Sequence, residues 1–271
     1  ASVGAPQGLR LWGDRGLEAA RLKGTALVTG ASSGIGAELA RVFAANGFDL
    51  VLTARRLDRL EALAAELRGR HQCRVHVMAA DLADPSSPSR LAREVAEAGL
   101  QVDALVNNAG YGLPGSFLSS PWESHRAFIQ VMVTAVAELC RLFAPGMVER
   151  RRGWIINVGS VAGLVPAAAG HTLYGAVKAL VIRFSESLSC ELRSHGVHVT
   201  ALCPGFTYSE FHDVNRMRAQ VSRLPSFLWL HADRVAREGY EAVMRGDPVF
   251  VNGRVYRAIV LGARLAPSWL V

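Results

Sequence analysis

The sequence has little that points to a membrane-spanning or secreted protein. No uninterrupted apolar run reaches the roughly 18 residues that a membrane-spanning helix needs, and the first residues lack the apolar core of a signal peptide. Cysteine is scarce, with four residues, Cys73, Cys140, Cys190 and Cys203. Their wide spacing fits neither a metal site nor a disulfide framework. We therefore expect reduced thiols in the protein core, no bound metal and a cytoplasmic location.

Charged residues are also scarce, at 20% of the chain, whereas 50% of the residues are hydrophobic. This composition excludes an extensively disordered chain and is sufficient for a sizeable core. Nothing in the 271 residues resembles a linker between two halves. We expect one domain over residues 24–253, a loosely attached leader at 1–23, and a basic, apolar tail at 254–271. We favour packing of this tail on the domain or on a neighbouring subunit over contact with a membrane surface.

Acidic residues are outnumbered, 23 against 30 Lys and Arg, which gives a net charge of +7. The arginines are spread along the chain, and the one tight cluster, at 150–152, has no aromatic residues interleaved with it. This pattern does not favour a nucleic-acid partner. A basic surface can instead attract an anionic cofactor, an anionic substrate or a membrane face.

Short apolar segments alternate with helical patterns through most of the chain. Strands are predicted at 25–29, 49–53, 75–79, 102–106, 154–158 and 197–202, and helices at about 35–46, 57–67, 88–98, 122–150 and 171–194. Strands that are apolar on both faces and alternate with helices are typical of a parallel sheet covered on both sides. The sequence therefore predicts an α/β fold with a doubly wound parallel sheet, flanked by helices in three layers.

A glycine-rich turn joins the first predicted strand to the first predicted helix. Its glycines, Gly30, Gly34 and Gly36, have the spacing G-x-x-x-G-x-G. A turn of this kind brings the unpaired amides of a helix N-terminus to a pyrophosphate. Gly30 would permit the tight turn, Gly34 the approach of the phosphates, and Gly36 close packing of helix on strand. We interpret the turn as a dinucleotide site; a turn that only needs flexible backbone is the alternative.

The end of the second predicted strand distinguishes two cofactors. An acid there binds the ribose hydroxyls of NAD, whereas Arg binds the 2′-phosphate of NADP. This chain has Arg55 and Arg56, and no acid before Asp58. Arg can bind phosphate through two parallel hydrogen bonds, and Ser32 and Ser33 can add hydroxyls. The pattern favours NADP (NADPH) over NAD; the alternative is that both arginines only begin a solvated helix.

Tyr174 and Lys178 are four residues apart in a predicted helix, so they lie on one face, a turn from each other. A nearby ammonium favours the phenolate, and we expect the pKa of Tyr174 to fall below its usual value of about 10. Ser160 follows a predicted strand, and its hydroxyl can bond a substrate oxygen that Tyr174 protonates. The three are candidates for proton transfer, although a Tyr-x-x-x-Lys spacing by itself occurs by chance on many helices.

Five motifs occur together in a characteristic order. They are Thr29–Gly36 (TGASSGIG), Asn107–Gly110 (NNAG), Ser160, Tyr174-x-x-x-Lys178 and Cys203–Gly205 (CPG). Over about residues 24–205 the chain thereby resembles the classical short-chain dehydrogenase/reductase family. The resemblance implies a Rossmann-type sheet of about seven strands, a nicotinamide cofactor, and hydride transfer between that cofactor and a carbonyl/alcohol pair. It also implies a homodimer or homotetramer formed through the two long helices.

The resemblance assigns roles to single residues. Ser160 would orient the carbonyl, Tyr174 would be general acid in reduction and base in oxidation, and Lys178 would lower the tyrosine pKa and hold the nicotinamide ribose. Asp81 with Leu82 would lie beside the adenine, and Pro204 with Gly205 beside the nicotinamide amide. Besides Tyr174 and Lys178, the cofactor-binding positions would be Gly30, Ser32, Ser33, Gly34, Ile35, Gly36, Arg55, Arg56, Asp81, Leu82, Asn108, Ala109, Gly110, Pro204, Gly205, Phe206 and Ser209.

One position departs from the family. Alignment through Pro145 and Gly146 places Met132 where the family has a catalytic Asn. A thioether is a weak acceptor and cannot hold the water that leads protons away from the Lys in the family. Either a backbone carbonyl and solvent carry the proton, or turnover is impaired. An apolar residue simply tolerated in a helix is a third interpretation. An alternative function follows, a low-turnover NADP(H)-binding sensor or partner subunit.

The segment at about 206–232 corresponds to the family's substrate-covering region. Aromatic and apolar residues are frequent in it, with basic residues between them: Phe206, Tyr208, Phe211, Phe227, Leu228 and Trp229, and His212, Arg216, Arg218 and Arg223. Small and apolar residues also fill the loop at 162–169. We expect a roomy apolar pocket and a lipophilic ketone or β-keto acyl substrate that can carry an anionic end. Aromatic residues that pack a lid or a dimer face are the alternative.

Overall fold

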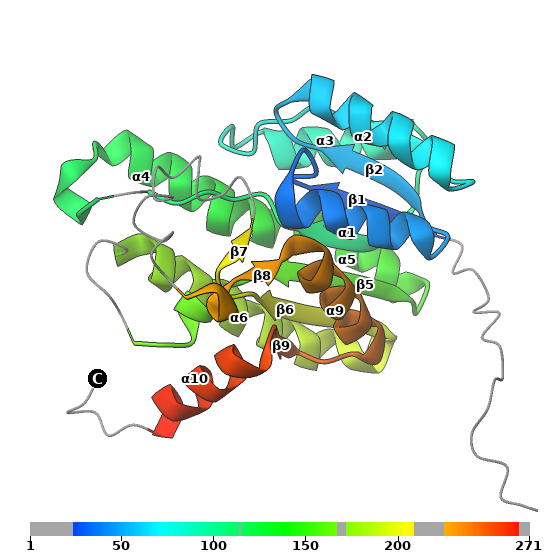
Figure 1. Cartoon of the computed structure of the whole chain (residues 1–271). Helices are drawn as coiled ribbons and strands as arrows, with labels where there is room; N and C mark the ends of the chain where they lie inside the picture. Colours follow the sequence, from blue (N-terminus) through cyan, green and yellow to red (C-terminus); the bar gives the residue numbers. More distant parts are fainter. Residues whose placement is uncertain (1–23, 114, 167–171, 209–224, 266–271) are drawn as a thin grey trace, which may run out of the picture.

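A parallel sheet of seven strands forms the centre of the protein. The computed structural model describes residues 24–113, 115–166, 172–208 and 225–265 (Figure 1). The strands lie in the order β3-β2-β1-β4-β5-β6-β9, and every pairing is parallel. They are β1 (Thr25–Thr29), β2 (Asp49–Thr53), β3 (Val75–Val77), β4 (Val102–Asn107), β5 (Gly153–Val158), β6 (Val197–Cys203) and β9 (Val249–Val251). The predicted doubly wound α/β fold and its strand number are confirmed.

Helices cover both faces of the sheet because successive strand residues point to opposite sides. Ala26 and Val28 of β1 belong to one core cluster, and Leu27 between them belongs to the other. The first cluster is closed by α1 (Gly34–Ala45), α2 (Leu57–Arg70) and α9 (Ala232–Arg245). The second is closed by α3 (Ser87–Glu97), α5 (Ala135–Glu149) and α6 (Thr172–Leu192). Figure 1 shows α1 and α9 on the near face of the sheet, with α5 behind it.

The strand order reverses between β1 and β4. Because β1 pairs with β2 on one side and with β4 on the other, the chain winds outward in opposite directions from this point. Ligands of open α/β sheets bind in the crevice outside the carboxyl ends of the strands at such a reversal. The glycine-rich turn after β1 and the segment after β4 both lie at this end of the sheet.

The long helix predicted at 122–150 is present but is not regular. It consists of α4 (Trp122–Ile129), a π-helical turn at Gln130–Thr134 and α5. Over 18 residues of Trp122–Glu149 the mean hydropathy reaches 1.6, so by length and composition this stretch can cross a membrane. It is not an uninterrupted apolar run, because charged residues such as Glu138 and Arg141 lie within it. Leu139, Ala144 and Met147 from it pack in the second core cluster, as in a core helix of a globular domain.

Of the four cysteines, Cys140 and Cys203 are buried, but Cys73 is half-buried and Cys190 is exposed, so the prediction that all are core residues is wrong.

The tail forms α10 (Arg254–Leu265), and its Tyr256 and Val260 are buried in the first core cluster, as packing on the domain requires. The leader at 1–23 and the last residues at 266–271 lie outside the described residues.

Candidate active site

The glycine-rich turn is a tight cradle at the N-terminus of α1. Gly30 and Gly34 have φ angles of +67° and +58°, which residues other than glycine rarely adopt. A Cβ on Gly30 would lie 2.7 Å from the Asn108 side-chain nitrogen, and one on Gly36 would overlap the Gly30 carbonyl. No side chain caps the first amides of α1, because Ser33 at the N-cap makes no capping hydrogen bond. The turn therefore presents unpaired backbone N–H groups to a ligand, as pyrophosphate binding requires.

Arg56 reaches from the end of β2 to this turn. Its guanidinium donates to the Ser32 hydroxyl at 3.1 Å and to the Ser33 hydroxyl at 2.9 Å. Arg55 beside it is exposed, and the first acid, Asp58, is exposed within α2. The structure thus brings Ser32, Ser33 and Arg56 together, as predicted, and leaves Arg55 free to face solvent or a ligand.

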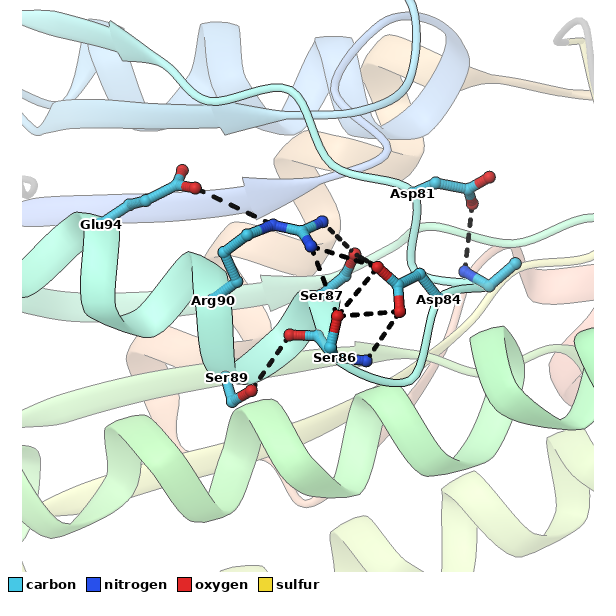
Figure 2. Close-up of polar contacts among 8 residues, drawn as sticks. Asp81, Asp84, Ser86, Ser87, Ser89, Arg90 and Glu94 are labelled. Atoms are coloured by element: carbon cyan, nitrogen blue, oxygen red, sulfur yellow. Dashed lines mark hydrogen bonds and ion pairs between the residues drawn. The ribbon is translucent and has the colours of Figure 1, made fainter.

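Asp81 lies in the loop between β3 and α3, which a dense set of hydrogen bonds holds in place (Figure 2). Asp81 accepts from the Ala83 amide at 3.0 Å. Asp84 accepts from the Ser86 amide at 2.9 Å and from Arg90 at 3.1 Å, and the bonds from Ser86 hold the pKa of Asp84 below its usual range. Leu82 between the two acids is buried. The loop is thereby fixed at the edge of the crevice.

Tyr111 was not singled out from the sequence, yet it lies close to two of the predicted residues. Burial raises the pKa of Tyr111, the positive charge of Arg55 lowers it, and the negative charge of Asp81 raises it further. Both charges are thus near one phenol. Its ring packs edge-on against Phe128 of α4, with the ring centroids 5.4 Å apart. Tyr111 directly follows the NNAG motif, and this adjacency is the signal that could have found it.

The segment after β4 is fastened to the glycine turn through Thr29. The Thr29 hydroxyl accepts from the amides of Asn108 and Ala109, at 3.0 Å each, and donates to the Val106 carbonyl. The Asn108 side chain donates to the carbonyls of Thr29 and Gly30, at 3.0 and 3.2 Å. These hydrogen bonds fasten the NNAG segment after β4 to the end of β1 and to the glycine turn.

A buried polar network behind the site was missed from the sequence. Asn107 donates to the Asn157 side chain at 2.8 Å, and Asn157 donates to the Ser185 hydroxyl at 2.9 Å. All three side chains are buried, so the network links β4, β5 and α6 where water cannot compete. The signal was present, since Asn157 interrupts the apolar run that precedes Ser160.

Ser160, Tyr174 and Lys178 meet at the carboxyl end of β5. Ser160 caps the short 3-10 helix Val161–Gly163 after β5, and its hydroxyl accepts from the Ala162 amide at 3.1 Å. It also forms a hydrogen bond with the Tyr174 hydroxyl. Lys178, buried one turn further along α6, donates to the Val158 carbonyl at 2.6 Å, and its Nζ lies 5.8 Å from the centroid of the Tyr174 ring. The geometry brings all three predicted residues together.

The predicted pKa of Tyr174 is wrong in direction. Burial raises the pKa of Tyr174 to about 12, and the hydrogen bond with Ser160 only partly opposes this. Burial also lowers the pKa of Lys178 to about 8. Loss of hydration thus outweighs the attraction between cation and phenolate. The Lys178 ammonium points to the Val158 carbonyl and the ring face, so the phenol stays protonated over the physiological range.

The cofactor-side residues after β6 are held by the C-terminal helix. Tyr256 of α10 accepts a hydrogen bond from the Phe206 amide at 3.0 Å, and its ring lies directly over Gly205. Pro204 is buried and accepts from the Val161 amide, which ties this segment to the loop after Ser160. Ser209 lies outside the described residues, as do Phe211, His212, Arg216, Arg218 and Arg223 of the covering segment.

Met132 lies in the π-helical turn between α4 and α5. The Ala135 amide donates to the Gln130 carbonyl, five residues back, which defines the wider turn. Met132 is 2% exposed and packs with Phe128 and Val177 beside Tyr174. Thr134, two residues further on, is exposed. Turns of this type are frequent at functional sites, and this one was not predicted from the sequence.

A small hollow opens beside Tyr174. Its walls come from α4, from the segment before it and from the start of α6; they include Leu113, Phe117, His125, Thr172, Leu173 and Tyr174. The hollow is where a substrate oxygen could meet the Tyr174 hydroxyl. The sequence analysis expected the apolar pocket to be lined by residues at 162–169 and 206–232, and it did not identify His125. Residues 167–169 of that loop lie outside the described residues.

Comparison with known proteins agrees with this geometry. The family model for short chain dehydrogenases matches residues 24–219. A sulfoacetaldehyde reductase of Chromohalobacter salexigens is 41% identical over 186 residues, which cover 68% of this chain and 72% of that protein. A short-chain dehydrogenase from Sphingobium yanoikuyae, solved in complex with NADPH, has a TM-score of 0.79 and 34% identity; the match covers 89% of this chain and 93% of that one.

A second solved structure carries the other nicotinamide cofactor. The short-chain dehydrogenase/reductase from Burkholderia phymatum, in complex with NAD, has a TM-score of 0.79 and 28% identity over 88% of this chain and 92% of that one. The family match spans the glycine turn, the NNAG motif, Ser160, Tyr174 and Lys178. This chain therefore belongs to the short-chain dehydrogenase family, whose members are oxidoreductases acting on alcohol and carbonyl groups.

Proposed function

We propose that this protein reduces a lipophilic ketone or β-keto acyl compound with NADPH, and that Tyr174 donates the proton. The observation that carries the proposal is the hydrogen bond between the hydroxyls of Ser160 and Tyr174, at the rim of a hollow that both Tyr174 and apolar side chains line. A carbonyl oxygen placed between the two hydroxyls accepts from both. Ser160 then orients the carbonyl, and the phenol, which its raised pKa keeps protonated well above physiological pH, acts as the general acid.

Lys178 has a positioning and an electrostatic role in this proposal. Its Nζ is fixed by the Val158 carbonyl at 2.6 Å, below the Tyr174 ring. When the phenol gives up its proton, the ammonium stabilises the resulting phenolate across the ring. The same ammonium has further protons to donate, and a ribose hydroxyl of the cofactor is the group that we propose it holds.

The residues at the glycine turn fit a nicotinamide dinucleotide. The cradle formed by Gly30 and Gly36 has no room for a Cβ, and the first amides of α1 lack a side-chain cap. Gly30, Ser32, Ser33, Gly34, Ile35 and Gly36 would hold the pyrophosphate, Asp81 and Leu82 would lie beside the adenine, and Asn108, Ala109, Gly110, Pro204, Gly205, Phe206 and Ser209 would line the remainder. When bound, the reduced nicotinamide supplies the hydride.

We infer a preference for NADP over NAD. Arg56 and the hydroxyls of Ser32 and Ser33 already form one hydrogen-bonded group, and Arg55 is exposed beside it. The guanidinium of Arg56 would donate to a 2′-phosphate instead of to the serine hydroxyls. Hydrogen bonds to a charged acceptor are stronger than those to a neutral hydroxyl. One of the two solved relatives holds NADPH and the other holds NAD. The inference that this chain prefers NADP therefore rests on Arg55, Arg56 and the two serines.

Apolar side chains support a lipophilic substrate. Leu113, Phe117 and Leu173 line the hollow beside Tyr174, and Trp122 and Phe227 are 57% and 66% exposed. Trp122 lies next to His125 of that hollow, with the ring centroids 6.3 Å apart. The relative named a sulfoacetaldehyde reductase supplies the competing class, a small anionic aldehyde, which the net charge of +7 would attract.

The assembly and the location are part of the proposal. Leu142 of α5 and Leu180 of α6 are exposed on the two long helices, which supports a homodimer or homotetramer formed through these helices. Light scattering on the purified chain measures the mass directly. The free state of all four thiols supports a cytoplasmic enzyme.

The test is NADPH consumption, followed by absorbance, with a bulky aryl ketone, a β-keto ester and sulfoacetaldehyde as substrates. Tyr174→Phe should lower kcat/KM by about 10²- to 10⁴-fold, the usual contribution of a positioned acid. Tyr240→Phe is the matched control, since Tyr240 is a half-buried phenol on α9 whose ring contacts Phe43. Turnover that survives in Tyr174→Phe would refute the assignment of the acid.

The alternative, a low-turnover sensor, is motivated by Met132 in the π-helical turn. It predicts tight NADPH binding, measured by fluorescence, with no consumption of NADPH by the wild type on any of the three carbonyl compounds. Consumption by the wild type that Tyr174→Phe abolishes excludes the sensor.

A further inference from the structure

The imidazole of His125 has an unusual environment. His125 lies in the first turns of α4 and is 5% exposed, yet its ring lines the hollow that contains Tyr174. The ring stacks on Phe117, with centroids 4.7 Å apart and planes 26° apart, and Trp122 covers another side at 6.3 Å. The side chain is therefore held in one orientation by aromatic contacts.

One hydrogen bond fixes which nitrogen carries the proton. The Nε2 atom of His125 lies 2.9 Å from the Phe117 carbonyl oxygen. A carbonyl oxygen can only accept, so Nε2 must be the protonated, donating nitrogen. In the neutral imidazole the other nitrogen, Nδ1, then carries a lone pair and is an acceptor.

This acceptor is unused. Nδ1 of His125 is buried and has no hydrogen-bond partner in the described parts of the chain, 24–113, 115–166, 172–208 and 225–265. Buried polar atoms in native proteins nearly always have a partner, and an unpaired one calls for an explanation. A ligand that enters the hollow and donates a hydrogen bond provides it.

We propose that His125 is a specificity-determining residue that accepts a hydrogen bond from a hydroxyl group of the substrate. The inference rests on the proposed function, since the hollow places that hydroxyl in the same compartment as the carbonyl reduced at Tyr174. Neither a ketone oxygen nor a carboxylate can donate to Nδ1, whereas an alcohol can. The walls formed by Leu113, Phe117 and Leu173 suit a carbon skeleton. The substrate class is thereby narrowed to hydroxyl-bearing lipophilic ketones, with diols as products.

The experiment compares a matched pair of ketones, 2-hydroxyacetophenone and acetophenone, which differ only in the hydroxyl. For the wild type we expect kcat/KM with NADPH to be about tenfold higher for the hydroxyketone, the size of one neutral hydrogen bond. His125→Phe keeps an aromatic ring against Phe117 and removes the acceptor, so the ratio of kcat/KM between the two ketones should fall to about one, whatever the absolute rate on each. His125→Asn places an amide oxygen near the position of Nδ1 and should restore part of the preference.

Binding provides a second readout that does not need turnover. Thermal stabilisation of the protein by each ketone is measured for the wild type and both variants, and the melting curve without ligand shows that each variant folds. If neither ketone is reduced but the hydroxyketone stabilises only proteins with an acceptor at 125, the site is supported and the proposed function fails. Equal rates and equal stabilisation for the two ketones in the wild type overturn the inference, as does a preference that persists in His125→Phe.

Discussion

Tyr256 lies directly over Gly205. A Cβ added to Gly205 would overlap the Tyr256 ring, and the Tyr256 hydroxyl accepts from the Phe206 amide at 3.0 Å while donating to the Leu228 carbonyl at 2.5 Å. Phe206 and Leu228 stand near the two ends of the predicted substrate-covering segment. One phenol on the C-terminal helix therefore fixes both ends of that segment.

Removing this hydroxyl should loosen the segment and leave the fold intact. Tyr256→Phe loses two hydrogen bonds, each contributing about 0.5–1.5 kcal/mol, so we expect the free energy of unfolding to fall by about 1–3 kcal/mol. Because Gly205 and Phe206 belong to the proposed cofactor site, KM for NADPH should rise several-fold and kcat should change less. Urea unfolding and steady-state kinetics measure the two effects.

Tyr240→Phe serves as the control, because its phenol lies on α9 against Phe43, in the helical layer on the first face of the sheet. It should leave KM for NADPH unchanged. The inference that α10 supports the cofactor site fails if both variants change KM for NADPH equally. It also fails if Tyr256→Phe lowers the stability without changing KM for NADPH.

Arg56 should determine the choice of cofactor. In Arg56→Gln the guanidinium that bridges Ser32 and Ser33 is lost. Loss of its hydrogen bonds to the charged 2′-phosphate should raise KM for NADPH by about 10- to 100-fold. KM for NADH, which lacks that phosphate, should stay within about threefold by the same reasoning. Steady-state kinetics with both cofactors give the ratio.

Arg70→Gln is the matched control for charge, since Arg70 lies at the far end of α2 and is paired only weakly, with Glu66 at 3.3 Å. An equal loss of affinity for NADPH in the two variants would mean that the overall positive field matters and Arg56 does not select the phosphate.

The sheet could be predicted from the sequence because its strands carry the signal themselves. Segments such as Thr25–Thr29, Asp49–Thr53 and Val197–Cys203 are short apolar runs between glycines or polar residues, and their ends were right within a residue. Strand β9 was not predicted, since Val249–Val251 is only three residues long and partly exposed. Helix α9 was not predicted either. The π-helical turn was also missed, because an inserted residue leaves the apolar pattern of Phe128–Thr134 almost unchanged.

The residues that form the site could be predicted from the sequence, but the pKa of Tyr174 could not. Ser160, Tyr174 and Lys178 meet as their spacing required. The direction of the Tyr174 pKa did not follow, because spacing along a helix says that two side chains are close and says nothing of how much water remains around them. His125 was missed for a related reason. Its importance depends on a buried, unpaired Nδ1, which only the three-dimensional packing reveals.

Met132 is expected to be a packing residue and not the limit on turnover. Its side chain is buried with Phe128 and Val177, and its sulfur faces Gly110. Met132→Leu, a swap of similar volume, should cost under about 1.5 kcal/mol and keep kcat. Met132→Asn buries an amide among apolar groups, which costs about 1–3 kcal/mol, and should not raise kcat. Thermal unfolding and NADPH consumption test both; a several-fold faster Met132→Asn would mean that the missing amide limits proton transfer.

Carbonyl reduction should decline as pH rises through about 8. Burial lowers the pKa of Lys178 to about 8 and raises that of Tyr174 to about 12. Below pH 8 the ammonium is charged and the phenol protonated, the pair that reduction needs. Above it Lys178 loses its proton while Tyr174 keeps its own, so the phenolate formed in the reaction is no longer stabilised. The pH profile of kcat/KM should therefore be flat below about pH 7 and fall up to tenfold per unit above about pH 8.

The titration of Lys178 can be observed directly, because the chain has only two lysines, Lys23 and Lys178. With ¹³C-labelled lysine, NMR should show two Cε resonances, and Lys23→Arg assigns the one that remains to Lys178. We expect it to titrate near pH 8, together with the fall in kcat/KM. A value close to the ordinary lysine pKa of about 10.4 would show that Lys178 stays charged over the whole range, and the decline in rate would then need another group.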